Sequence, residues 1–271
     1  MKLKMNKKNK IIISILAIFI IIGIIMACFV ADFVLSNREY YKNEKNIDIP
    51  IFVYHDISYE QTNEEYMQTI KGNFEKQIEG LRKLGYKIIT YDDLIAYNNG
   101  EKKLPQKSLI LTFDDGWVGN YTVLFPIVKE YNIPIAINVI DNKVGEEGYL
   151  NWEQIKEMSD SGLVYIYSHG KEHIESYKIE TEQFVDDIEY AHSNIEKNIG
   201  KNVTKVYTYP YGLYEEEKIE ALAKAGFVQN LTDNKVNNSK ELDLSRLHRE
   251  YPLNDPVWKI LLKTVYRSIR Y

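Results

Sequence analysis

The sequence predicts an α/β protein: a distorted (β/α) barrel of about seven parallel strands, preceded by one N-terminal transmembrane helix. Short runs rich in β-branched and aromatic residues alternate with segments whose apolar residues recur at helical spacing, which is typical of a parallel sheet covered by helices. About seven such pairs fit into residues 49–271, which favours a barrel over an open sheet. An apolar run too long for an ordinary core helix stands ahead of them.

That N-terminal run predicts a membrane anchor. From Ile11 to Ala31 there is no charged residue, and these 21 residues would form a helix about as long as a bilayer core is thick. The first ten residues hold five lysines and no acid, which favours a cytoplasmic N-terminus. We therefore expect a cytoplasmic tail at 1–10, an anchor at 11–35 and a polar stalk at 36–48. The domain at 49–271 would lie outside the cell, at a Gram-positive-like surface.

Two alternatives to an uncleaved anchor stay open. A cleaved signal peptide would need a small-x-small site, and none follows the apolar run. A lipoprotein signal is the other, because Ile25-Met26-Ala27-Cys28 loosely matches a lipobox, in which Met26 fits poorly. Cys28 is the chain's one cysteine, so the exported part would have no disulfide. The net charge is −5 although five lysines lie at the N-terminus, which argues against a nucleic-acid partner.

The elements of the domain at 49–271 follow from local patterns. Gly85 and Gly100 end the first two helices, and each later strand is a short apolar run after a helical segment. The C-terminal stretch is a basic amphipathic helix, which would pack on the barrel or lie against a membrane, with packing favoured. The expected strands are 51–54, 87–90, 108–113, 135–140, 163–168, 205–209 and 227–231, and the expected helices are 73–86, 91–100, 123–131, 152–162, 180–198, 215–226 and 255–271.

Two histidines follow the expected strand 163–168. His169 and His173 in SHGKEHIE are four residues apart, so one helical turn would put both imidazoles on the same side. Two neutral imidazoles and one carboxylate make a three-ligand catalytic zinc site, with positions left open for water and substrate. Two solvated histidines at a helix start are the alternative. The position at a strand end favours the metal interpretation.

Two adjacent aspartates, Asp114 and Asp115, follow the apolar strand in LILTFDDGWVGN. Adjacent residues at a strand end point in opposite directions, so one carboxylate can face a metal ion and the other a water molecule. An Asp-Asp-Gly turn is the alternative. The strongly apolar strand ahead of the pair, together with a second strand end that bears histidines, favours a site.

Two more segments leave expected strands. In VYTYPYGLYEEE, the turn Pro210-Tyr211-Gly212 exposes a backbone N–H and presents Tyr211 to the mouth of the barrel, unless it is an ordinary aromatic turn. In PIFVYHDIS, His55 ends the first strand, where a lone histidine is more often structural than catalytic. Trp152 and Tyr211 are candidates for stacking on sugar rings, although Trp152 could equally be packing.

Together these segments resemble the polysaccharide deacetylase (NodB-homology) family of carbohydrate esterases. TFDDG matches the first motif of that family, HGKEH (169–173) matches the spacing of its H-[ST]-x-x-H motif, and YPYG matches its third motif as one large branch has it. The segment Y-H-D-I ahead of TFDDG is similar to the poly-N-acetylglucosamine deacetylase branch, whose motif order is circularly permuted. The resemblance covers roughly Ile49 to Tyr251.

The resemblance implies a role for each of these residues. Asp115, His169 and His173 would bind a divalent metal, with Zn²⁺ expected, and Asp114 would be the general base that takes a proton from water. The backbone N–H of Tyr211 would stabilise the oxyanion. His55 would be the general acid that protonates the leaving amine. A bound cation would offset the repulsion between the paired aspartates.

Three departures from the family pattern matter: Gly170, Thr208 and the late histidine of the unpermuted family, which has no clean match here. Gly170 replaces the usual Ser or Thr, so the metal loop is expected to be looser and metal binding weaker. Thr208 stands where many members carry an arginine that orients the base. His248, in DLSRLHREY, is an alternative to His55 as the acid, and His55 is favoured because it matches the permuted branch. His192 is expected to be solvated on a polar helix.

The resemblance implies a hydrolase of non-peptide C–N bonds, which removes acetyl groups from an N-acetylglucosamine-containing extracellular glycan. Poly-β-1,6-N-acetylglucosamine of a biofilm matrix is the expected substrate, and peptidoglycan of the cell wall is the alternative. A catalytically inactive glycan-binding module on the same fold is a hypothesis of another class. An esterase acting on acetylated xylan is disfavoured by the permuted motif order. The membrane is an expected partner through the N-terminal helix.

Overall fold

The computed structural model describes residues 13–21, 24, 47–60, 68–240 and 242–270. Residues 13–21 are helical. Within these ranges no helix is both long enough and apolar enough to cross a membrane. Most of the expected anchor at 11–35 and stalk at 36–48 falls outside the described residues, so both stay predictions. Internal contacts divide the chain after Asn46, and the unit that starts at Ile47 is described below by itself.

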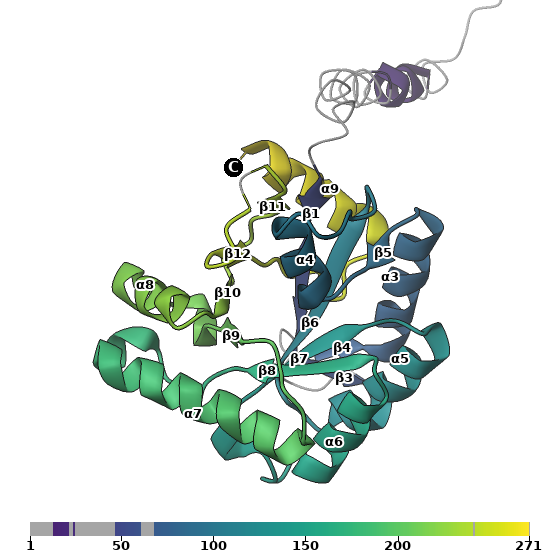
Figure 1. The fold of residues 1–271 in the computed structure, drawn as a ribbon. Coiled ribbons are helices and arrows are strands. Elements are labelled where there is room, and N and C mark those ends of the chain that lie inside the picture. Colours follow the sequence, from purple (N-terminus) through teal and green to yellow (C-terminus); the bar gives the residue numbers. More distant parts are fainter. Residues whose placement is uncertain (1–12, 22–23, 25–46, 61–67, 241, 271) are drawn as a thin grey trace, which may run out of the picture. The chain divides into compact units, whose positions relative to one another are not determined.

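Seven parallel strands form the wall of a barrel (Figure 1). Each strand hydrogen-bonds to the next in the order β12-β10-β9-β8-β7-β6-β2. The predicted α/β barrel of about seven parallel strands is therefore confirmed. The strands are β2 (Ile51–Tyr54), β6 (Ser108–Asp115), β7 (Ile135–Val139), β8 (Val164–Ser168), β9 (Val206–Thr208), β10 (Val228–Leu231) and β12 (Leu247–His248).

A seam closes the ring between the first and last of these strands. Glu250, two residues after β12, forms an isolated parallel bridge with Phe52 of β2. The Val53 N–H donates to the Glu250 carbonyl (3.0 Å), and the Glu250 N–H donates to the Ile51 carbonyl (3.0 Å). The barrel is thus nearly closed by two segments from opposite ends of the unit.

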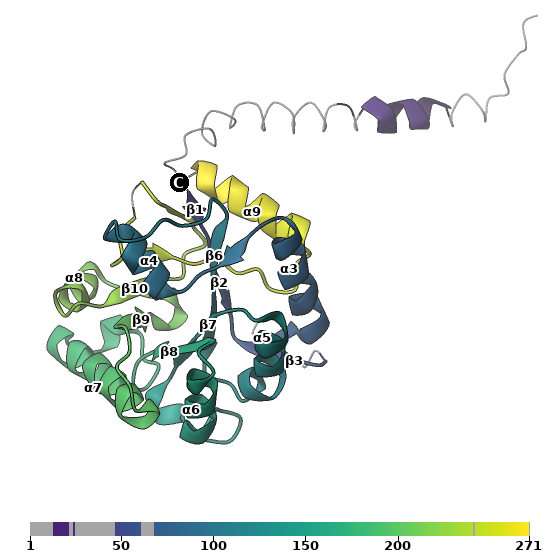
Figure 2. The ribbon, with the colours of Figure 1, turned by 45° about the vertical axis from the view of Figure 1, so that its right-hand side comes forward.

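Helices cover the outside of the barrel in both ribbon views (Figures 1 and 2). Side-chain capping boxes begin two of them, at Thr90 and Asn151. A π-helical turn at Asn120–Leu124 precedes α5, where the sequence predicts one regular helix. The helices are α3 (Lys71–Lys83), α4 (Tyr91–Asn98), α5 (Phe125–Tyr131), α6 (Trp152–Asp160), α7 (Thr181–Ile199), α8 (Glu216–Lys224) and α9 (Val257–Arg270).

Short strands that the sequence analysis did not predict decorate the barrel. The antiparallel pair β1 (Asp48–Ile49) and β11 (Asn237–Asn238) lies at one end, and β3 (Asp56–Ser58) pairs in parallel with β4 (Gln68–Ile70). The expected strand 87–90 is reduced to β5 (Lys87–Ile88), which pairs with the start of β6. These strands are two or three residues long, too short for a period-two pattern to be visible.

The core lies on both sides of the barrel wall. All eight residues of β6 are buried, because the strand has neighbours on each side, helices outside and side chains inside. At the C-terminus α9 packs on α3, as expected: Ile260 is 2% exposed, and a Cβ at Gly80 would lie 2.6 Å from Cγ2 of Val257. Gly80 therefore allows α9 to approach α3 closely.

Candidate active site

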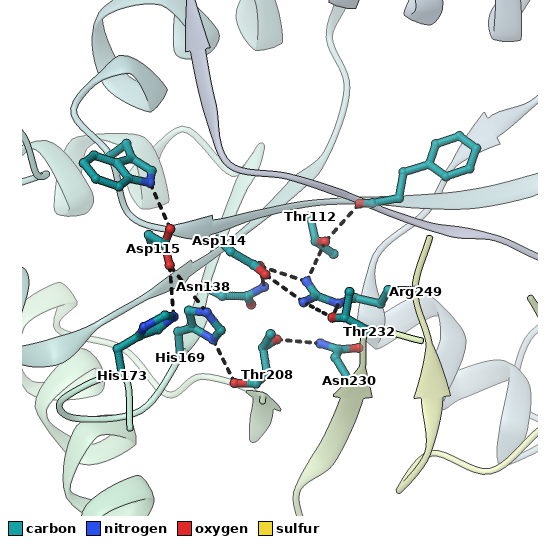
Figure 3. Close-up of polar contacts among 12 residues, drawn as sticks. Thr112, Asp114, Asp115, Asn138, His169, His173, Thr208, Asn230, Thr232 and Arg249 are labelled. Carbon is teal, nitrogen blue, oxygen red and sulfur yellow. Dashed lines mark hydrogen bonds and ion pairs between the residues drawn. The ribbon is translucent and has the colours of Figure 1, made fainter. Parts of the chain in front are cut away.

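The predicted site residues gather where the parallel strands end. The pair Asp114 and Asp115 ends β6, His169 follows β8, Tyr211 follows β9, and His55 follows β2. All of them line a pocket of about 520 Å³, together with His173. Because the strands are parallel, their carboxyl ends share one face of the barrel, which is where such folds carry their chemistry. Figure 3 shows how the central polar side chains meet.

Asp115, His169 and His173 bring three ligand atoms together (Figure 3). The Asp115 Oδ1 atom lies 3.5 Å from His169 Nε2 and 3.4 Å from His173 Nε2. This oxygen is buried and accepts no hydrogen bond. The three ligand atoms all lie within 4.8 Å of one another, so the predicted metal ligands form one cluster.

The protonation of His169 makes this cluster suited to a cation. Its Nδ1 atom lies 2.8 Å from the Thr208 carbonyl, so Nδ1 carries the proton and the Nε2 lone pair faces Asp115. Burial lowers the pKa of His169 to about 3, and burial also lowers the pKa of His173. If both imidazoles are neutral and their Nε2 lone pairs face Asp115 Oδ1, three acceptor atoms lie together without a donor between them. A metal ion would satisfy all three.

Left-handed backbone, and no helical turn, brings the two histidines together. Residues 169–175 form a loop, so the predicted one-turn helix is wrong although the two rings do meet, with centroids 4.8 Å apart. His173 has φ 55° and Gly170 has φ 87°. The loop doubles back through these two residues, which a periodicity argument could not anticipate. Asp115 (φ 72°) is a third non-regular position, and such strain is common at functional sites.

Asp114 points away from the cluster and is held by a buried arginine (Figure 3). Its Oδ1 accepts from Arg249 Nη1 (2.8 Å), and its Oδ2 accepts from Arg249 Nη2 (2.7 Å). Asn138 Nδ2 also donates to Oδ1 (2.7 Å). Burial alone would raise the pKa of Asp114, but the charge and hydrogen bonds of Arg249, together with the nearby His169 and His55, outweigh burial and hold this pKa well below its usual range. Asp114 is therefore ionised at any working pH.

Arg249 is a site residue that the sequence analysis missed. It is 1% exposed, and its guanidinium also donates to Thr112 Oγ1 (3.0 Å) and to Thr232 Oγ1 (2.6 Å). Thr208 stands where many family members carry an arginine, and Arg249, directly after β12, holds Asp114 here. The sequence analysis expected no strand at 247–248, so it gave no reason to place Arg249 at the site. Nothing local indicated that this arginine points inward.

The structure separates the two candidates for the general acid. His55 lines the pocket, and its ring stacks on Tyr251 with centroids 6.2 Å apart. His248 does not line the pocket, and its Nδ1 pairs with Asp233 Oδ2 at 2.9 Å. His55 is thus the histidine with access to a bound substrate.

Tyr211 lies at the rim of the pocket. It has φ 59°, its side chain is 63% exposed, and its ring centroid lies 4.5 Å from that of His173. Trp152 packs against the core and does not line the pocket, which agrees with the packing alternative. The expectation for His192 is wrong: it is 5% exposed, beside the ring of Phe227, because α7 packs on α8 and β8.

Two hydrogen bonds to the backbone of Gly170 hold the loop formed by residues 169–175. Its N–H donates to Ser168 Oγ (3.1 Å), and its carbonyl accepts from the Asp141 N–H (3.0 Å). At φ 87° a residue with a Cβ would be strained. Gly170 lacks the hydroxyl that family members usually carry at this position, and these two hydrogen bonds hold the loop. The weaker metal binding expected from Gly170 stays a prediction.

Comparisons with known proteins identify sequence relatives of this chain. The sequence profile of the family described as polysaccharide deacetylase matches residues 101–229. Among curated proteins, YxkH of Bacillus subtilis, named as a polysaccharide deacetylase, is 31% identical over 77% of this chain and 72% of its own. The poly-beta-1,6-N-acetyl-D-glucosamine N-deacetylase of Staphylococcus epidermidis is 29% identical over 67% of each chain.

Solved structures give the same result. IcaB from Ammonifex degensii superposes with a TM-score of 0.70 at 25% identity, over 80% of this chain and 97% of that one. The chain belongs to the polysaccharide deacetylase family.

Proposed function

We propose that the protein is a metal-dependent N-deacetylase that acts on an extracellular glycan, poly-β-1,6-N-acetylglucosamine, anchored to the cell membrane by residues 11–35. The observation that carries the enzymatic part is the three-ligand cluster beside a carboxylate that Arg249 keeps ionised. The glycan is supported by the name of the Staphylococcus epidermidis relative, a poly-beta-1,6-N-acetyl-D-glucosamine N-deacetylase. The anchor rests on the apolar run alone.

In this proposal Asp115, His169 and His173 would hold the metal ion, which would supply Lewis-acid activation of water and of the acetamide carbonyl. Asp114 would accept a proton from the attacking water. Because its pKa is depressed, Asp114 is a weak base, and it needs a water that is already acidic. Arg249 holds the Asp114 carboxylate in one orientation through two hydrogen bonds. The Tyr211 N–H donates to the developing oxyanion, and His55 gives a proton to the departing amine.

The test is the release of free amine and acetate from poly-β-1,6-N-acetylglucosamine oligomers by the purified, zinc-loaded protein. Equal amounts of amine and acetate are expected, and none after chelation of the metal. Peptidoglycan, β-1,4-linked N-acetylglucosamine oligomers and an acetate ester serve as comparison substrates. Release from peptidoglycan alone would contradict the proposed glycan. Binding of the oligomers without any release, with the metal confirmed in place, would identify an inactive binding module.

The general acid can be tested by two histidine substitutions. We expect His55→Ala to lower kcat by about two orders of magnitude or more, because the amine would leave unprotonated. His248→Ala is the matched control: it removes a histidine that pairs with Asp233 outside the pocket, so kcat should change by less than about threefold. Steady-state rates of amine release decide between them. The opposite ranking would transfer the acid role to His248.

Trp117 provides a test of metal binding itself. Its indole Nε1 donates to Asp115 Oδ2 (3.0 Å), which leaves Oδ1 free for the ion, and its ring stacks on Tyr149 with centroids 4.6 Å apart. Trp117→Phe keeps a stacking ring and removes the donor. We expect the dissociation constant for Zn²⁺, measured by chelator competition, to rise about 10- to 100-fold, as for other partners of metal ligands. Trp152→Phe, away from the ligands, should leave it unchanged.

A further inference from the structure

The C-terminal helix α9 carries a row of large apolar side chains on its outer face. Trp258, Leu262 and Tyr266 follow one another at four-residue spacing, so they lie along one side of the helix. They are 67%, 61% and 55% exposed. Ile260 and Thr264 are 2% and 5% exposed, because their face packs on the barrel. We call these three exposed residues the α9 ridge.

Positive charge lies beside the ridge. The sequence of α9 contains lysines and arginines and no acidic residue. Lys259 and Lys263 share a single carboxylate, that of Asp255, at 2.6 and 2.5 Å, so one positive charge is left over. Their side chains are 47% and 32% exposed. This local charge is opposite in sign to the net charge of the whole chain, which is −5.

The ridge lies at the end of the unit where the chain enters. Strand β1 (Asp48–Ile49) is the first element after Ile47, and it lies beside α9 in both views (Figures 1 and 2). The first described residues of the unit therefore lie on the side that carries α9. The relevance of this side to a membrane rests on the anchor proposed above.

We propose that the α9 ridge docks on the surface of an anionic lipid bilayer. Trp and Tyr are the side chains that favour the headgroup level, Leu262 between them would reach the acyl boundary, and the lysines would meet lipid phosphates. A glycan is the weaker candidate for this surface, because none of the three ridge residues lines the pocket. Lys263 and Arg267, on the flank of α9, do line it.

The experiment uses the full chain reconstituted in vesicles and a single fluorescent label. Cys28→Ser removes the one native cysteine. Leu262→Cys then takes an environment-sensitive dye on the ridge, and Tyr190→Cys, at a 55% exposed position on α7, is the matched control. In phosphatidylglycerol vesicles we expect blue-shifted emission and several-fold weaker iodide quenching at position 262 and no change at 190. Phosphatidylcholine vesicles, or Trp258→Ser with Tyr266→Ser, should remove most of this protection.

Each other outcome overturns the proposal. Equal quenching at positions 262 and 190 would mean that the ridge stays in water. Protection that needs added poly-β-1,6-N-acetylglucosamine oligomers would assign the ridge to the glycan, and protection that disappears on dilution would assign it to a second copy. A chain that does not float with phosphatidylglycerol vesicles would contradict both ridge and anchor. Amine release from soluble oligomers in detergent tests the proposed function separately, and the double serine variant should keep it within about twofold.

Discussion

Replacement of Asp114 by asparagine is expected to lower kcat by about two to four orders of magnitude, because the amide cannot accept the proton of the attacking water. Asp114 is 3% exposed and receives hydrogen bonds from Arg249 and Asn138, so the asparagine would occupy the same space. Asp115, His169 and His173 are unchanged by the substitution. The variant should therefore bind zinc and glycan oligomers while releasing almost no amine.

Stability must be measured alongside this loss of activity. Asparagine at position 114 leaves the Arg249 charge buried without a counterion, and breaking a buried pair from one side costs about 3–5 kcal/mol. Metal content and the unfolding midpoint of Asp114→Asn show whether the folded protein is being assayed. An Asp114→Asn protein that is folded, holds zinc and retains more than about a tenth of the wild-type kcat would contradict the base assignment.

Replacement of Arg249 by methionine is expected to have the largest effect on stability. The guanidinium donates to Asp114, Thr112 and Thr232 at 1% exposure, so its removal leaves a buried carboxylate without its cation. We expect the free energy of unfolding to fall by about 3–5 kcal/mol. Urea unfolding of the metal-free protein measures this change. The rate of amine release should fall as well, because Asp114 loses the two bonds that orient it.

Arg246→Met is the control for this prediction. Arg246 also makes a two-pronged contact with a carboxylate, that of Glu216 (2.9 and 2.5 Å), but its side chain is 34% exposed and that of Glu216 is 68% exposed. Such a pair contributes about 0–1 kcal/mol. The double variant Asp114→Asn with Arg249→Met should regain part of the stability and none of the activity. If Arg249→Met lowered the free energy of unfolding no more than Arg246→Met does, the buried Arg249–Asp114 pair would contribute little to stability.

The barrel and the grouping of Asp115, His169 and His173 could be predicted from the sequence because their signals are local. An apolar run that ends in Asp114 and Asp115 marks a buried strand and its functional end at once. The loop from His169 to His173 shows the limit of this approach. The four-residue spacing correctly predicted that the two histidine rings meet, but it predicted a helical turn between them. In the structure a loop with left-handed residues at Gly170 and His173 brings the rings together.

Arg249 could not be predicted because its role depends on ring closure. Its partner Asp114 is distant in the sequence, and the two meet only when the last strand closes against the first. Local patterns carry no information on such a pairing. The resemblance also directed attention to Thr208, where other members carry their arginine. The anchor at 11–35 stays a prediction, since most of it lies outside the described residues.

The seam at Glu250 and Phe52 has a consequence for the order in which the protein becomes competent. As the chain is synthesised from its N-terminus, Asp115, His169 and His173 are all available well before Arg249 emerges. A nascent or truncated chain could therefore gather this cluster but not hold Asp114, because the arginine arrives with the segment that closes the barrel. Synthesis would thus complete the site almost last, together with the fold.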